Sequence, residues 1–191
     1  QHRGPDNSSI FSDNNIFLGS CRLSIFDLSN NANMPMQDAS GRYTITYNGE
    51  IYNFIEIKKK FNINTKTESD TEVLIELYSI LKEKCLNELN GIFSFIIYDS
   101  LENIFFCARD RLGVKPFYFT SNEKINFHAS SEIQAISNFS KENLNLNYVK
   151  NYLETSFYDY GDETFFNNIY QLLPGSYLKY QIDNKKIEIT K

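Results

Sequence analysis

The sequence has few of the residues on which many active sites depend: 3 Cys, 2 His, 4 Pro and no Trp among 191 residues. The cysteines, Cys21, Cys85 and Cys107, are odd in number and widely spaced, which argues against a disulfide framework and against a Cys-x-x-Cys metal knuckle. We therefore expect a reducing, cytoplasmic setting. With only His2 and His128, a histidine-based metal site or a Ser-His-Asp triad has little material, so we expect no metal.

Other absences exclude whole classes of protein. No window approaches the ~18 apolar residues that a transmembrane helix needs. There is no Gly-x-Gly-x-x-Gly loop, no phosphate-binding loop ending in Gly-Lys-Ser/Thr and no His-Glu-x-x-His. The net charge of −5 leaves no basic stripe for nucleic acid or an anionic membrane. We therefore expect a small-molecule partner, no nucleic acid and no membrane.

The chain does contain enough apolar material for a core. Hydrophobic residues make up 41% of it, with 16 Phe and 13 Tyr, and charged residues make up 23%. No internal repeat and no linker rich in Pro, Gly or Ser divides it. These features predict one domain over residues 1–191.

The apolar pattern predicts an α+β fold. Runs typical of strands cover residues 16–26, 43–47, 92–98, 104–108, 125–128, 177–182 and 187–190. A short polar segment joins the runs 92–98 and 104–108, which favours an antiparallel hairpin. A 3.6-residue period predicts a helix over residues 69–89, begun by a capping box from Ser69 to Glu72. Shorter helices are predicted at 54–61 and 148–157.

Four short segments combine polar, charged and glycine residues. They are residues 2–6 (His-Arg-Gly-Pro-Asp), 22–25 (Arg-Leu-Ser-Ile), 47–53 (Tyr-Asn-Gly-Glu-Ile-Tyr-Asn) and 109–118 (Arg-Asp-Arg-Leu-Gly-Val-Lys-Pro-Phe-Tyr). In this order they closely resemble the glutaminase domain of asparagine synthetases, class II glutamine amidotransferases of the N-terminal-nucleophile hydrolase fold. The likeness also includes residues 68–73, 129–133 and 173–177. The resemblance implies a four-layer αββα sandwich and L-glutamine as the substrate.

The site residues that the resemblance implies also have simpler interpretations. Arg22 alone could be a surface cation, but its planar guanidinium suits the α-carboxylate of glutamine, the role that the resemblance implies. Asn48 and Gly49 would by default form a hairpin turn. The resemblance makes them the oxyanion hole, and a turn could present them. Asp70 could simply favour the helix dipole, whereas the resemblance implies that Asp70 and Glu50 contact the α-amino group.

Two further residues, Leu23 and Ile25, complete the glutamine-binding set that the resemblance implies. Residues 109–118 are the most diagnostic of asparagine synthetases, and we interpret them as a turn and strand that hold two sheets together.

The nucleophile of the resembled family is a cysteine at the mature N-terminus, whose own α-amine acts as the base. This chain begins with Gln1, so we expect a few tens of residues before it and no glutaminase activity from the 191 residues alone. Cys21 is internal and has no free amine, so it is a poor substitute. Cys85 and Cys107 are predicted to be core thiols.

By resemblance, the parent enzyme hydrolyses glutamine and supplies ammonia for the ATP-dependent amidation of aspartate to asparagine. We expect ATP and Mg in a synthetase domain beyond Lys191, no cofactor in this domain, and a homodimer as one assembly. Three alternatives stay open: a related enzyme with another acceptor, for example in surface-polysaccharide synthesis; another class II amidotransferase; and a non-catalytic glutamine-binding module.

Overall fold

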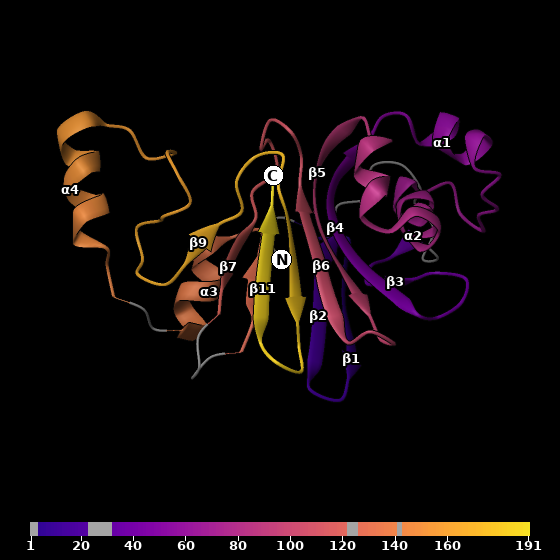
Figure 1. The fold of residues 1–191 in the computed structure, drawn as a ribbon, viewed down its shortest axis with the longest axis horizontal. Helices are drawn as coiled ribbons and strands as arrows, with labels where there is room; N and C mark the ends of the chain where they lie inside the picture. Colours follow the sequence, from indigo (N-terminus) through magenta and orange to yellow (C-terminus); the bar gives the residue numbers. More distant parts are fainter. Residues whose placement is uncertain (1–3, 23–31, 122–125, 141–142) are drawn as a thin grey trace.

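The computed structural model describes residues 4–22, 32–121, 126–140 and 143–191. Its largest element is an antiparallel six-stranded sheet in the order β11-β10-β6-β5-β4-β3 (Figure 1). The strands are β3 (Met36–Gln37), β4 (Tyr43–Ile51), β5 (Gly91–Asp99), β6 (Ile104–Arg109), β10 (Tyr177–Gln181) and β11 (Lys186–Thr190).

Two smaller antiparallel sheets accompany the large one. They contain β1 (Asn7–Asp13) with β2 (Ile16–Arg22), and β8 (His128–Ser130), β7 (Tyr118–Thr120) and β9 (Tyr170–Gln171). The helices are α1 (Phe54–Lys60), α2 (Asp70–Leu81), the 3₁₀ helix η2 (Lys82–Asn87), α3 (Ile133–Ser140) and α4 (Leu146–Thr155).

The elements stack in four layers. On one face of the large sheet, α1, α2 and η2 bury a core that includes Ile45, Leu77 and Phe106. On the other face, the small sheets cover a second core, to which Leu18 of β2 and Phe119 of β7 contribute. Helix α3 packs against β7 and β8 (Figure 1). The order of helix, sheet, sheet and helix confirms the predicted α+β four-layer sandwich.

Strand β6 shows how one sequence serves both cores. Every residue of the strand is buried. Because side chains alternate across a strand, Phe106 and Ala108 enter the helix-side core, whereas Phe105 and Cys107 enter the core between the sheets. A continuous apolar run is the expected pattern for a strand that is covered on both faces.

The structure confirms the predicted hairpin and contradicts the predicted turn. β5 and β6 pair antiparallel, with Ile97 opposite Phe106. Asn48 and Gly49, by contrast, do not form a turn. They lie inside β4 and pair with Ser94 and Phe93 of β5. The turn prediction fails because pairing with β5 continues through Ile51, and this long-range pairing overrides the local Asn-Gly preference.

The start of α2 is only partly as predicted. Ser69 is the N-cap, and its side chain accepts a hydrogen bond from the Thr71 amide. Glu72 does not complete a capping box. Its carboxylate instead accepts hydrogen bonds at 2.8 Å from the amides of Lys66 and Thr67, in the loop before the helix. Of the helices within the described ranges, none combines the length and apolarity that a membrane crossing requires.

Candidate active site

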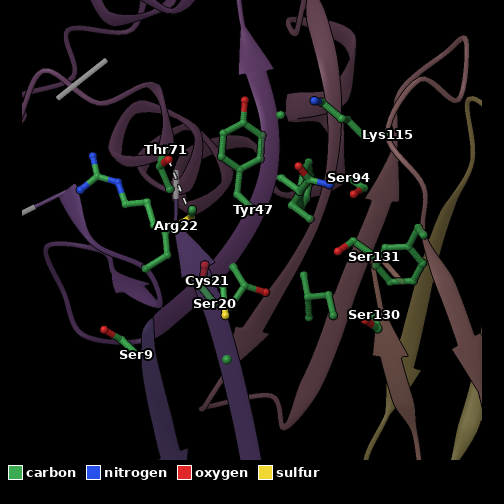
Figure 2. Close-up of a pocket in the computed structure, with 18 of the residues that line it drawn as sticks. Ser9, Ser20, Cys21, Arg22, Tyr47, Thr71, Ser94, Lys115, Ser130 and Ser131 are labelled. Atoms are coloured by element: carbon green, nitrogen blue, oxygen red, sulfur yellow. Dashed lines mark hydrogen bonds between the residues drawn. The ribbon is translucent and has the colours of Figure 1, made fainter. Parts of the chain in front are cut away.

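A cavity of about 670 Å³ lies between the large sheet and the two small sheets, at the N-terminal end of α2. β4 and β5 contribute residues from the large sheet, and β1, β2 and β8 contribute from the small ones. Figure 2 shows Arg22 and Thr71 on one side of this pocket, and Ser94, Lys115, Ser130 and Ser131 on the other.

Five of the seven predicted glutamine-binding residues line this one pocket. They are Arg22, Asn48, Gly49, Glu50 and Asp70. The other two, Leu23 and Ile25, lie outside the described residues. The fold therefore brings together residues from three separate segments, while their individual roles stay predictions.

Arg22 ends β2 and is only 9% exposed, which excludes its interpretation as a surface cation. Its Nη1 atom donates a hydrogen bond to Asn33 Oδ1 at 2.8 Å. Burying a guanidinium is costly unless hydrogen bonds and a negative charge compensate it. Arg22 lines the pocket, where its planar guanidinium can bind a carboxylate.

Strand alternation places the β4 side chains on opposite faces of the large sheet. Tyr47 and Ile51 belong to the helix-side core. Asn48 and Glu50 have the opposite parity, so their side chains point toward the small sheets and line the pocket.

The backbone N–H of Gly49 is directed toward the pocket edge of β4. Phe93, which pairs with Gly49, exchanges its hydrogen bonds with Asp110 instead: Asp110 N donates to Phe93 O at 2.8 Å, and Phe93 N donates to Asp110 Oδ2 at 3.2 Å. In an antiparallel ladder, both backbone groups of a residue point the same way, so Gly49 turns its own away from β5. Ile51 shares that parity, and its N–H donates to Asp70 Oδ2 at 2.9 Å.

Gly49 has no room for a side chain. A Cβ atom at this position would lie 2.2 Å from the backbone oxygen of Ile92. Only glycine allows β4 to approach β5 this closely.

The side-chain amide of Asn48 is an unused donor. Its Nδ2 atom is buried and has no hydrogen-bond partner in the part of the chain that the structure describes. Leaving a buried donor unpaired costs about 1–3 kcal/mol, so such groups are rare in native proteins and call for an explanation. Together with the Gly49 N–H, this amide can receive an oxygen atom that becomes negatively charged.

Asp70 is a buried carboxylate that has no cationic partner among the described residues. It is 5% exposed, and its Oδ2 atom accepts hydrogen bonds from Tyr47 Oη at 2.8 Å and from Ile51 N. Within the described ranges, no Lys, Arg or His forms an ion pair with it. Burial raises the pKa of Asp70, although the hydrogen bonds from Ile51, Tyr47 and Thr71 oppose this effect. An ammonium group would compensate the charge.

The three cysteines are free thiols with different surroundings. Cys21 is exposed and lines the pocket, and its pKa is lowered mainly by the hydrogen bond with Ser8. Cys85 and Cys107 are buried, which raises the pKa of Cys85 to about 12 and that of Cys107 well above its ordinary value. The prediction that these two are core thiols is confirmed.

Sequence reasoning missed several residues of this pocket. Tyr47 and Lys115 belong to segments that the sequence analysis had selected, so the sequence contained a pattern that pointed to them as pocket residues. Ser94, which also lines the pocket, had no such pattern, because it lies in an apolar strand. Asn33, which accepts the hydrogen bond from Arg22, had none either, because it lies in an Asn-rich stretch. Among the described residues, no group of three or more His, Cys, Asp or Glu could hold a metal ion.

Comparison with known proteins identifies the family. The sequence profile of the glutamine amidotransferase domain matches residues 1–191. A Methanocaldococcus jannaschii protein, named as a glutamine-hydrolysing asparagine synthetase, is 38% identical over 208 residues, covering 98% of this chain and 40% of that protein. Asparagine synthetase 3 of Bacillus subtilis is 41% identical over 138 residues, covering 70% of this chain and 22% of that enzyme. The chain therefore spans less than half the length of these relatives.

A solved structure supports the fold independently of the sequence. Glutamine phosphoribosylpyrophosphate amidotransferase from Bacillus subtilis, complexed with ADP and GMP, superimposes with a TM-score of 0.63 at 16% identity, over 91% of this chain and 34% of that one. This likeness shows the fold alone, an α+β sandwich of the kind described above. From the match over all 191 residues and the identity with these relatives, we conclude that the chain belongs to the glutamine amidotransferase domain family, alongside the glutamine-hydrolysing asparagine synthetases.

Proposed function

We propose that this domain binds L-glutamine in the described pocket and, in the full product of its gene, hydrolyses the side-chain amide to release ammonia. One observation carries the proposal: a single pocket gathers a buried guanidinium, a buried carboxylate and a buried amide donor. Among the residues that the structure describes, the carboxylate has no cation and the amide nitrogen has no hydrogen-bond partner. These three groups complement the α-carboxylate, the α-ammonium and the amide oxygen of glutamine.

The amino-acid end of the substrate binds between opposite charges. Arg22 donates two parallel hydrogen bonds to the α-carboxylate, as the planar guanidinium allows. Asp70 and Glu50 accept from the α-ammonium. Because no described residue forms an ion pair with Asp70, binding the ammonium relieves the cost of burying its charge, and this selects a free amino acid.

Hydrolysis requires a thiolate to attack the side-chain carbonyl carbon. Ammonia then leaves, a glutamyl thioester remains, and water converts it to glutamate. Asn48 Nδ2 and Gly49 N–H stabilise the negative oxygen of the tetrahedral intermediate. The proposal assigns the nucleophile to none of Cys21, Cys85 and Cys107, since two are buried and Cys21 carries no free α-amine.

The names of the relatives suggest how the ammonia is used. We propose that it amidates aspartate to asparagine, with ATP and magnesium, at a site that does not include the residues described. The three free thiols fit the proposed cytoplasmic setting. A homodimer stays a prediction.

The test measures synthesis by the full gene product with glutamine and with free ammonia as the nitrogen donor. Arg22→Ala should weaken glutamine-dependent synthesis and leave ammonia-dependent synthesis nearly unchanged, because free ammonia bypasses the pocket. Asn48→Ala should lower kcat for glutamate release by about 10²-fold, with a smaller change in KM.

Thr46→Ala is a matched control, because Thr46 lies on the same face of β4 and lines the pocket without an assigned role. It should keep kcat within about twofold. Equal loss with both nitrogen donors in Arg22→Ala would overturn the proposal, as would unchanged turnover in Asn48→Ala.

A further inference from the structure

The loop that follows β6 is fastened to β5 opposite the oxyanion-hole pair. Asp110 exchanges two hydrogen bonds with Phe93, and Ser94 Oγ donates to Pro116 O at 3.0 Å. Phe93 is the cross-strand partner of Gly49, and Ser94 is that of Asn48. The two ends of the loop therefore hold the two β5 residues against which the proposed oxyanion donors pack.

The Asp110 carboxylate organises this loop. It is 1% exposed and accepts four backbone N–H groups: Leu112 at 3.1 Å and Val114 at 3.0 Å on Oδ1, and Lys115 at 3.0 Å and Phe93 at 3.2 Å on Oδ2. A buried carboxylate satisfied by several backbone donors forms charge-assisted hydrogen bonds, which are stronger than neutral ones. These bonds tie the loop to β5.

The Arg109 guanidinium also holds the loop in place through hydrogen bonds. Its Nε donates to Lys115 O at 2.9 Å, and its Nη2 donates to Gly113 O at 2.8 Å. Its Nη1 donates to Leu172 O at 2.7 Å, just after β9. The loop is therefore attached to the large sheet and to the sheet of β7, β8 and β9, consistent with the structural role predicted for residues 109–118.

Few contacts of its own fix the position of Gly49. It carries no side chain, and its backbone groups point away from β5, so its position depends on contact with Ile92 and Phe93. What fixes Phe93 on its far side is Asp110. Donors in an active site act only when held within about 0.5 Å of the productive geometry.

We propose that Asp110 is a positioning residue for the oxyanion hole: through Phe93 it sets where the Gly49 N–H and, through the loop and Ser94, the Asn48 amide lie in the pocket. The proposal rests on the proposed function, because it assumes that these two donors stabilise a tetrahedral intermediate. Asp110 touches no substrate, and it acts through β5 alone.

Asp99 offers a matched comparison at the other end of β5. It is also 1% exposed, and its carboxylate accepts backbone N–H groups from the turn that follows, those of Leu101 and Glu102. Neither aspartate lines the pocket, but Asp110 accepts a hydrogen bond from the pocket-lining Lys115, whereas the bonds of Asp99 lie at the other end of β5. Replacing either residue by Asn removes a buried charge and weakens a turn, but only one of the two turns contacts the partners of Asn48 and Gly49.

The experiment measures glutamate release by the full gene product carrying Asp110→Asn or Asp99→Asn. Asp110→Asn should lower kcat by about tenfold or more and change KM by less than about threefold, because Arg22 and Asp70 are undisturbed. Asp99→Asn should keep kcat per folded molecule within about twofold. Ser94→Ala, which removes only the contact with Pro116, should lower kcat by about threefold and serves if Asp110→Asn does not fold.

Equal kcat values for Asp110→Asn and Asp99→Asn would overturn the proposal, as would a loss confined to KM. A second measurement does not depend on activity: the backbone amide resonance of Gly49 should shift in Asp110→Asn and stay in place in Asp99→Asn. No glutamate release by the unsubstituted gene product would contradict the proposed function, while the Gly49 resonance would still decide whether Asp110 positions it.

Discussion

Asp70 and Asp99 are aspartates of nearly equal burial, at 5% and 1% exposure, yet the protein treats their charges in opposite ways. Asp99 accepts hydrogen bonds from Arg42 Nε at 2.7 Å and Arg42 Nη2 at 2.6 Å. Burial alone would raise its pKa, but the hydrogen bonds from Arg42, Glu102 and Leu101 outweigh burial and lower it. Asp70 has only neutral donors, and burial raises its pKa.

This difference in charge compensation distinguishes a structural aspartate, Asp99, from an aspartate that lines the pocket, Asp70. At Asp99 the protein compensates the charge with its own cation and closes the turn between β5 and β6. At Asp70 the described residues supply hydrogen bonds to the carboxylate but no cation, and in our proposal the ammonium group of the ligand supplies the compensating charge. Sites that are poorly compensated in the free protein lower stability but favour binding.

The largest expected effect is on stability, at Asp99. Asp99→Asn should lower the free energy of unfolding by about 2–3 kcal/mol, because Arg42 loses its buried ionic partner. Urea denaturation measures this, with glutamine affinity as the control that should not change. A loss below about 0.5 kcal/mol would show that the Arg42 pair contributes no more than a surface salt bridge.

Asp70→Asn should have the opposite effects: stability is kept, and glutamine affinity falls. The amide oxygen can still accept from Tyr47 and Ile51, and the cost of burying a charge disappears, so the melting temperature should stay equal or rise. The affinity for L-glutamine should fall by about 10- to 100-fold, since the substrate ammonium loses a charge-assisted hydrogen bond. Isothermal titration calorimetry measures this. Unchanged affinity in Asp70→Asn would break the proposed contrast between the two carboxylates.

Asp70 and Asp99 should also contribute to the pH dependence of stability with opposite signs. The folded pKa of Asp70 lies above the ordinary value of 3.8, so its charge destabilises the fold progressively as pH rises from 3.8 through that raised pKa. The folded pKa of Asp99 lies below 3.8, so its stabilisation is present above 3.8 and is lost as pH falls through the lowered pKa.

To test both signs, the free energy of unfolding is measured across this pH range for the wild type, Asp70→Asn and Asp99→Asn. Lowering the pH through the raised pKa of Asp70 should also weaken glutamine binding, and Asp70→Asn should remove that dependence. A dependence of the same size in the variant would assign it to another group.

The smallest effect is expected from Arg42→Lys. Lysine keeps the charge but cannot donate two parallel hydrogen bonds to Asp99. The free energy of unfolding should fall by about 0.5–1 kcal/mol, clearly less than in Asp99→Asn. Equal losses in the two variants would mean that the bidentate geometry, and not the ionic pairing, stabilises this turn.

Local patterns predicted much of the fold. The β5–β6 hairpin, α1, α2 and α4 were recognisable because their apolar periods and short connections are properties of the chain itself. Strand β1 and helix α3 were not predicted, since β1 alternates weakly and α3 follows a short strand without a strong cap. Within the predicted helix over 69–89, α2 ends at Leu81, and the 3₁₀ helix η2 begins at Lys82, whose φ is 54°.

The sequence by itself determined which residues could recognise glutamine, because guanidinium, carboxylate and amide groups have fixed chemistry, and their order along the chain matches a family. It also determined the α+β composition through its apolar periods. Only the tertiary structure decided that Asn48 and Gly49 lie in a strand, that Asp70 forms no ion pair within the described part of the chain, and that Asp110 holds Phe93. These facts depend on burial and pairing between segments far apart in the chain, which no local pattern encodes.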